Sequence, residues 1–160
     1  MAKLRDVVAY VAMHYPYKSE LSKARLTKMV YLADWRSAIL YGSQITSIQW
    51  EFNHYGPYVE DVVKVARNDS DFSIKQTSTM YGDPKDVISV ATDAEFESLS
   101  EHDRAVLDFV IGTVSPKNWN DFIRLVYSTF PIVTQPRHSK LNLVELAQRY
   151  KGVASEISSE

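Results

Sequence analysis

The chain has 160 residues, of which 45% are hydrophobic and 24% charged, as expected for one domain with a single core. A net charge of −2 and a pI near 6.1 argue against a broad basic face for DNA or RNA. The sequence contains no cysteine, which excludes disulfides, thiol catalysis and Cys-ligated zinc. It shows neither a secretory leader nor an apolar stretch of membrane-spanning length. We therefore expect a cytoplasmic protein without membrane attachment.

Two N-terminal segments have helical periodicity. Residues 3–14 place apolar side chains at the spacing that lines one helix face. A second helix is predicted from a cap at Ser19 or Ser22 to about Gly42. It is expected to be the central element of the fold, because its apolar side chains cover nearly its whole circumference. One face carries Leu26, Met29, Val30, Ala33 and Leu40, and most of the rest carries Tyr31, Leu32, Trp35 and Ile39.

The next segment alternates polar with apolar or aromatic side chains, which predicts a strand. The alternating set is Ile48, Trp50, Phe52 and His54. Gly56 and Pro57 are predicted to end this strand and to turn the chain into a short helix over residues 58–68.

A β-hairpin is predicted further along the chain. Residues 71–80 and 86–92 are strand-like, and Gly82, Asp83 and Pro84 form a turn signal between them. We expect this hairpin to join the Trp50 strand in a three-stranded antiparallel sheet.

The last third of the chain is predicted to be helical. Ser100 and Asp103 form a variant capping box, and Asn118 and Asn142 can each cap a further helix. An extended connector is expected over residues 131–136.

These elements predict a single α+β domain over residues 1–152, mostly helical, with a central apolar helix and a small three-stranded antiparallel sheet. Residues 153–160 are expected to form a frayed C-terminal tail.

The sequence lacks the residue spacings of common catalytic, metal and phosphate sites. No H-E-x-x-H, G-x-S-x-G, G-x-G-x-x-G or P-loop pattern occurs. None of the four histidines lies three or four positions from another; they are His14, His54, His102 and His138. We therefore expect no metal, no cofactor and no enzymatic activity, and we interpret the chain as a binding module.

Two polar residues of the central helix, Lys28 and Asp34, project between apolar neighbours. An unpaired buried charge is costly. Asp34 is therefore expected to anchor the fold, accepting hydrogen bonds from backbone amides of the corner after the strand. The alternative is a general base in a hydrolase or nuclease site with His54 and Tyr55.

Two sets of residues are candidates for binding. His54 and Tyr55 carry amphipathic rings, and the sequence leaves open whether they face the core or a partner. Lys23, Arg25 and Lys28 form a basic cluster that is expected to be a solvated face. Since no recognition helix accompanies this cluster, DNA binding is not expected.

The segments "LTKMVYLADWRSAILYGSQIT" and "WEFNHYGPYVEDV" resemble the Panacea domain, the SocA-like, phage-associated antitoxin family. The family pattern is an L-x-K-L-x-Y-L-A-D helix, a small-residue segment with Ile-Thr, and a strand that leads into a Y-G-P corner and a helix. The resemblance covers about residues 20–65. Matching positions are Leu26, Lys28, Tyr31, Leu32, Ala33, Asp34, Gly42, Ile45, Thr46, Tyr55, Gly56, Pro57 and Val62.

This resemblance implies an antitoxin that neutralises a protein toxin, encoded by an adjacent gene, through direct contact. Alternatives are an adaptor that delivers the toxin to a protease, or a nucleic-acid-binding regulator. The expected partner-binding residues are His54, Tyr55 and Tyr58. The expected structural motif consists of Lys28, Tyr31, Asp34, Gly56 and Pro57.

Overall fold

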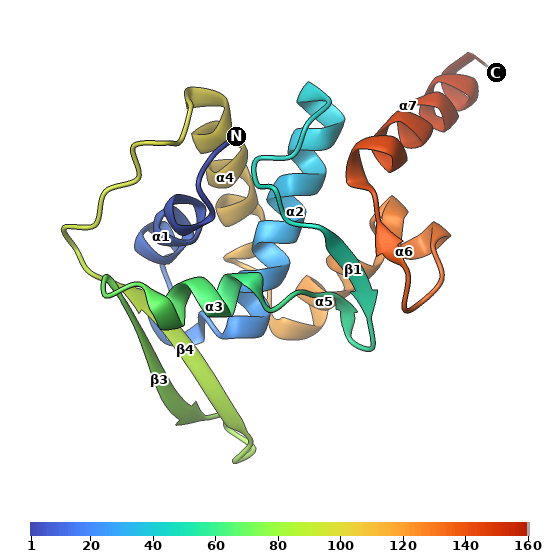
Figure 1. Cartoon of the computed structure of the whole chain (residues 1–160). Coiled ribbons are helices and arrows are strands. Elements are labelled where there is room, and N and C mark those ends of the chain that lie inside the picture. The colour runs from blue at the N-terminus through green and yellow to red at the C-terminus, as the bar shows by residue number, and fades with distance from the viewer. Residues whose placement is uncertain (160) are drawn as a thin grey trace.

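A computed structural model describes residues 1–159, with side chains up to residue 155. Helices pack around a central helix, and two small antiparallel sheets lie at the edges of the helical body (Figure 1). The prediction of a mostly helical α+β fold is confirmed. The elements are α1 (Leu4–His14), a 3-10 turn (Lys18–Glu20), α2 (Lys23–Tyr41), β1 (Trp50–Asn53), β2 (Gly56–Pro57), α3 (Asp61–Asn68), β3 (Phe72–Ser78), β4 (Pro84–Val90), α4 (Glu101–Val114), α5 (Trp119–Tyr127), α6 (Phe130–Thr134), β5 (Lys140–Leu141) and α7 (Leu143–Ser159).

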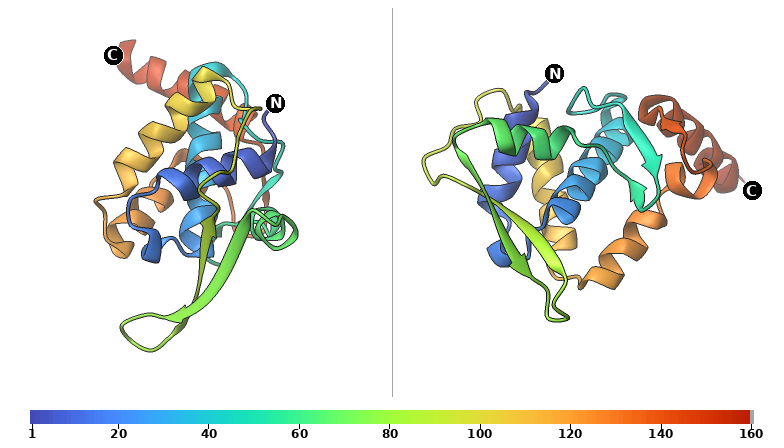
Figure 2. Two further views of the ribbon diagram at one scale, coloured as in Figure 1. Left: turned by 90° about the vertical axis from the view of Figure 1, so that its left-hand side faces the viewer. Right: turned by 60° about the horizontal axis from the view of Figure 1, so that its bottom comes forward.

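The central helix is α2, as the sequence predicts. The Ser22 side chain caps its first turn by accepting a hydrogen bond from the Arg25 amide at 3.1 Å. Gly42 ends it in the left-handed region at φ 73°. Helices α1, α3, α4 and α7 all contact α2, and two further views show it surrounded (Figure 2). The prediction that Leu40 belongs to its buried face is wrong: Leu40 is 49% exposed, because the last turn lines a surface groove instead of the core.

The three-stranded sheet is formed by different strands from those predicted. Strand β1 lies between β2 and β5, with Phe52 opposite Pro57 and Trp50 opposite Leu141. Gly56 and Pro57 were expected only to end the strand, but they pair back onto it. Pro57 is tolerated because β2 is an edge strand.

The predicted hairpin forms as β3–β4 but makes a separate two-stranded sheet, so the expectation that it joins β1 is wrong. Its β4 edge instead meets the segment before α2, where the Ile88 amide donates to the Leu21 carbonyl at 3.0 Å. Instead of the hairpin, β1 pairs with β5, which is only two residues long. A segment of that length has no detectable periodicity in the sequence.

Helices of the last third begin where the sequence predicts. Ser100 and Asp103 form a complete capping box on α4, and Asn118 caps α5. The predicted extended connector at 131–136 is wrong, because residues Phe130–Thr134 form α6. Pro131 stands at the start of that helix, where no amide donor is required.

Helix α7 continues through Gly152 to Ser159, so the backbone there is helical where a frayed tail was expected from residue 153. The domain boundary at residue 152 stays a prediction. Within residues 1–159, none of the helices has both the length and the apolar character needed to span a bilayer.

Candidate protein-binding groove

Asp34 of α2 is fully buried and fastens the loop between α2 and β1. Its Oδ1 accepts hydrogen bonds from the amides of Ile45 at 2.9 Å and Thr46 at 3.0 Å. Its Oδ2 accepts from the Thr46 hydroxyl at 2.6 Å, from Trp50 Nε1 at 2.8 Å and from Gln44 Nε2 at 3.3 Å. The backbone donors therefore come from the segment before the strand, not from the corner after it as predicted.

This geometry suits an anchor better than a general base. Burial raises the pKa of Asp34 to about 6, while the hydrogen bonds from Thr46, Trp50 and Ile45 act in the opposite direction. The carboxylate is enclosed, and it lines neither of the two main surface cavities of the described residues. It is therefore not available to act with His54 and Tyr55 on a substrate.

Tyr31, another residue of the expected structural motif, contacts two neighbouring parts of the fold. Its ring packs edge-on against Trp50 at 5.5 Å, and its hydroxyl shares a 2.8 Å hydrogen bond with the Thr129 hydroxyl. It thereby ties α2 both to β1 and to the segment between α5 and α6.

His54 and Tyr55 form the turn between β1 and β2, and both are exposed. Their rings meet edge-to-face at 4.6 Å, and Tyr55 is 75% exposed. The question that the sequence left open is thus answered: these side chains do not face the core. Gly56 permits the turn by taking φ 98°.

The hairpin turn forms one wall of a groove of about 630 Å³. Asn53, His54 and Tyr55 line this wall, and Tyr58 lies beside it. All three predicted partner-binding residues therefore meet at one surface feature. Their role in binding stays a prediction.

Helix α5 supplies the opposite wall, which the sequence did not predict. Trp119, Ile123 and Tyr127 line it. Trp119 is 44% exposed, and the sequence did not mark it as a surface residue. The only signal available was that a second large aromatic, Phe122, already occupies the buried face of the same helix.

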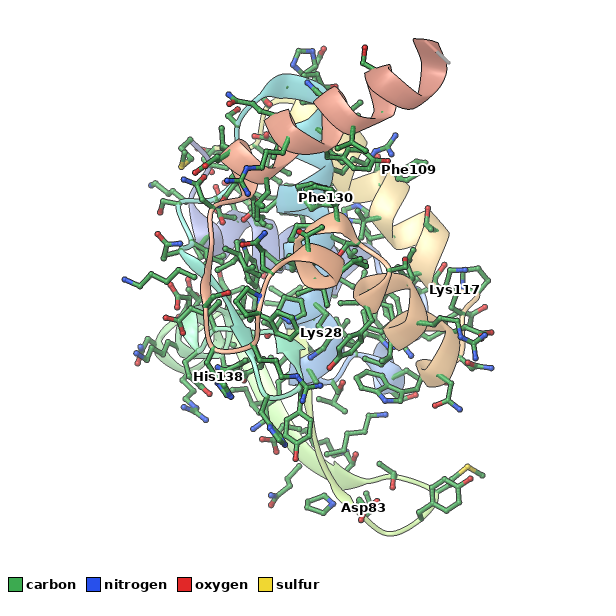
Figure 3. The ribbon with its side chains drawn as sticks, turned by 90° about the vertical axis from the view of Figure 1, so that its right-hand side faces the viewer. Lys28, Asp83, Phe109, Lys117, Phe130 and His138 are labelled. Atoms are coloured by element: carbon green, nitrogen blue, oxygen red, sulfur yellow. The ribbon has the colours of Figure 1, made fainter. Side chains whose placement is uncertain are left out.

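The base of the groove is the N-terminal half of α2, contributed by Lys23, Ala24 and Lys28. Figure 3 shows Lys28 between the β1 strand and α5. The prediction that Lys23, Arg25 and Lys28 form a solvated basic face is wrong. Arg25 and Lys28 are buried, because they lie on sides of α2 that neighbouring elements cover.

Arg25 and Lys28 differ in how they are compensated. The Arg25 guanidinium donates to the Tyr15 hydroxyl at 3.2 Å and lies over the Phe122 ring at 4.8 Å. Among the described residues, Lys28 has only the Tyr58 ring as a compensating contact, with its Nζ 5.7 Å from the ring centre. Burial lowers the pKa of Lys28 to about 8.

Among the residues whose side chains are described, no three His, Cys, Asp or Glu side chains gather as metal ligands. The groove is instead an aromatic surface with a cation at its base. Such a surface can bind apolar and anionic groups of another molecule.

The sequence profile of the family described as "Antitoxin SocA-like, Panacea domain" matches residues 26–130. The match includes α2 from Leu26 onward, Asp34, both sheet hairpins and the α5 wall of the groove. No curated protein and no solved structure matches the chain. The profile match spans more than half of the 160 residues, and the chain belongs to this antitoxin-like family.

Proposed function

We propose that this chain is an antitoxin that neutralises a protein toxin, encoded by an adjacent gene, by binding it directly through the groove between α5 and the β1–β2 hairpin. Membership of the antitoxin-like family supports the general role. The observation that carries the choice of surface is the exposure of His54 and Tyr55 at the rim of this groove.

The composition of the groove supports a protein partner. Protein interfaces concentrate their binding energy in a few aromatic and Arg side chains near the centre of the contact. Tyr55, Tyr58, Trp119 and Tyr127 present four aromatic rings around one hollow. Their hydroxyl and indole groups remain able to form hydrogen bonds while the ring faces are covered.

The test is co-expression of the chain with the product of the neighbouring gene in the cytoplasm, where we place the pair. We expect growth to be restored and the two proteins to co-purify as a complex. Growth arrest in the presence of well-expressed, folded chain, together with failure to co-purify, would refute the proposal.

The same experiment separates neutralisation from delivery to a protease. A directly blocked toxin accumulates in the complex, and its level does not depend on cellular proteases. If toxin disappears in the presence of the chain and reappears in protease-deficient cells, the chain acts as an adaptor.

A nucleic-acid-binding function has less support than it had from the sequence. Two of the three cations in the basic cluster, Arg25 and Lys28, are buried, so the cluster does not present an open basic face to the backbone of a duplex. Titration with duplex DNA at low salt tests this directly, and we expect no saturable binding.

A further inference from the structure

The base of the groove holds a buried cation that lacks a partner. Lys28 is 3% exposed, and its side chain forms neither a hydrogen bond nor a salt bridge with any residue that the structure describes. Its Nζ still touches the water of the groove, since it is not among the fully enclosed, unpaired side-chain atoms of the described residues. An ammonium group has three N–H donors and no acceptor. The Tyr58 ring, 5.7 Å from Nζ, provides attraction but no hydrogen-bond acceptor.

The groove itself contains no compensating charge. Its lining includes Lys23 and Lys28 but neither an Asp nor a Glu. Lys23, which also belongs to the base, already has a partner, Asp86, whose Oδ2 is 3.5 Å from its Nζ. The charge that remains uncompensated within the groove is therefore that of Lys28.

We propose that the groove takes an acidic segment of the toxin, in which the carboxylate of one Asp or Glu pairs with Lys28 Nζ while neighbouring side chains pack on the aromatic walls. This inference rests on the proposed function and specifies the chemistry of its partner. A carboxylate supplies both the acceptor atoms and the opposite charge that Lys28 lacks.

A carboxylate suits this position better than an apolar group. If an apolar group alone covered the groove, the unpaired ammonium would lose its remaining water. This loss of hydration is unfavourable in free energy. Pairing with a carboxylate while Tyr55, Tyr58 and Trp119 exclude solvent yields a desolvated charge pair. Such a pair governs the dissociation rate and discriminates strongly against partners without the acid.

The first experiment measures the affinity of the neighbouring-gene toxin for wild-type chain, Lys28→Met and the control Lys64→Met, at an exposed lysine of α3 outside the groove. Methionine keeps the length and apolar stem of lysine but removes its charge. We expect Lys28→Met to raise the Kd by about thirtyfold or more and Lys64→Met to change it by less than about threefold. An unchanged Kd for folded Lys28→Met overturns the inference.

This design separates two failures. If wild-type chain neither binds nor rescues, the proposed function itself fails. If wild-type and Lys28→Met chains bind equally well, only the carboxylate pairing fails.

The second experiment identifies the acid by double-mutant cycles. Each Asp of the toxin is changed to Asn and each Glu to Gln, and every variant is titrated against wild-type and Lys28→Met chain. We expect one toxin variant to weaken wild-type binding but to leave the affinity of Lys28→Met nearly unchanged. If every toxin variant shows purely additive effects, Lys28 does not pair with an acid.

The third measurement uses the wild-type protein and does not depend on a folded variant. NMR of the Lys28 Cε–Nζ group reports its pKa in the free chain and in the complex. We expect the pKa to rise from about 8 on toxin binding, because a paired carboxylate favours the ammonium form. A pKa that stays or falls contradicts the pairing.

Other titratable groups face the same groove and are followed in the same titration. They are Lys23 on α2, His54 and Tyr55 on the hairpin turn, Tyr58 before α3, and Tyr127 on α5. Glu60 lies outside the groove lining but acts on Tyr58, whose pKa it raises.

Discussion

Replacement of Lys28 by methionine should make the free chain more stable. The unpaired ammonium destabilises the folded state, since burial lowers its pKa from 10.5 to about 8. Each pKa unit corresponds to about 1.4 kcal/mol, so the charged form costs the fold roughly 3 kcal/mol. Methionine removes this cost but also loses the contact with the Tyr58 ring. We expect a net gain of about 1–3 kcal/mol in the free energy of unfolding at pH 7.

The pH dependence gives this prediction a definite sign. Between pH 8 and 10.5 the unfolded chain holds a proton on Lys28 that the folded chain has released. Stability therefore rises with pH through this window. Wild-type chain should gain about 2 kcal/mol relative to Lys28→Met between pH 7 and pH 9.5. Burial and Glu60 raise the pKa of the neighbouring Tyr58, so its phenol stays neutral over this range.

Urea unfolding of the two proteins at pH 7 and pH 9.5 measures both effects. The titrations of the other ionisable groups are common to the two chains and cancel in the difference. Two results would refute the reasoning: a Lys28→Met chain that is clearly less stable at pH 7, or a stability difference that does not change with pH. Either would mean that the ammonium is already compensated in the free fold.

Three further predictions concern Asp34, which anchors the α2–β1 loop, Gly56 in the β1–β2 turn, and Tyr55 at the rim of the groove. Asp34→Asn should lower the free energy of unfolding by about 3 kcal/mol, measured in urea, because an amide group cannot accept all five donors and the Trp50 indole N–H is left unpaired. Gly56→Ala should cost about 1–2 kcal/mol, since φ is 98° and a Cβ would contact an α5 ring at 3.4 Å. Tyr55→Ala should leave the melting temperature unchanged but weaken toxin binding about tenfold or more. The control is Tyr81→Ala, at an 85% exposed tyrosine of the β3–β4 turn, which should change neither the melting temperature nor toxin binding.

Each of these three predictions can be contradicted separately. A stable Asp34→Asn protein would show that the carboxylate does not hold the α2–β1 loop. If Gly56→Ala unfolds at the wild-type urea concentration, the turn is not strained by a side chain. Equal toxin affinities for Tyr55→Ala and Tyr81→Ala would place the interface away from the groove.

The sequence predicted local structure well because local chemistry determines it. Ser100 and Asn118 were predicted as caps, and Ser22 was one of two candidates for α2; each caps its helix. The alternation around Trp50 and Phe52 gave the correct strand and its buried face. The sequence failed where the partner of an element is distant, since β1 pairs with two residues near position 140. Neither the periodicity nor the composition of such a short strand predicts its partner.

For the same reason, the sequence predicted the groove residues on one side but not those on the other. His54, Tyr55 and Tyr58 lie close together in sequence, and their amphipathic rings suggested binding. The wall formed by Trp119 and Tyr127 is far away in sequence and becomes part of the site only when α5 packs in place. The burial of Lys28 was equally hidden, because it depends on which elements cover that side of α2.

Helix α2 carries two buried charged residues that differ in their hydrogen-bond partners. Asp34 has five hydrogen-bond donors from the α2–β1 loop and β1, so the fold itself explains its presence. Lys28, less than two helical turns away, has no acceptor in the described part of the chain, and its only close aromatic contact lines an open groove. A charge that destabilises the free protein is consistent with selection for a bound state. The unpaired member of this pair is therefore the reason why we propose this groove as the partner-binding surface, and the paired member holds the α2–β1 loop next to it.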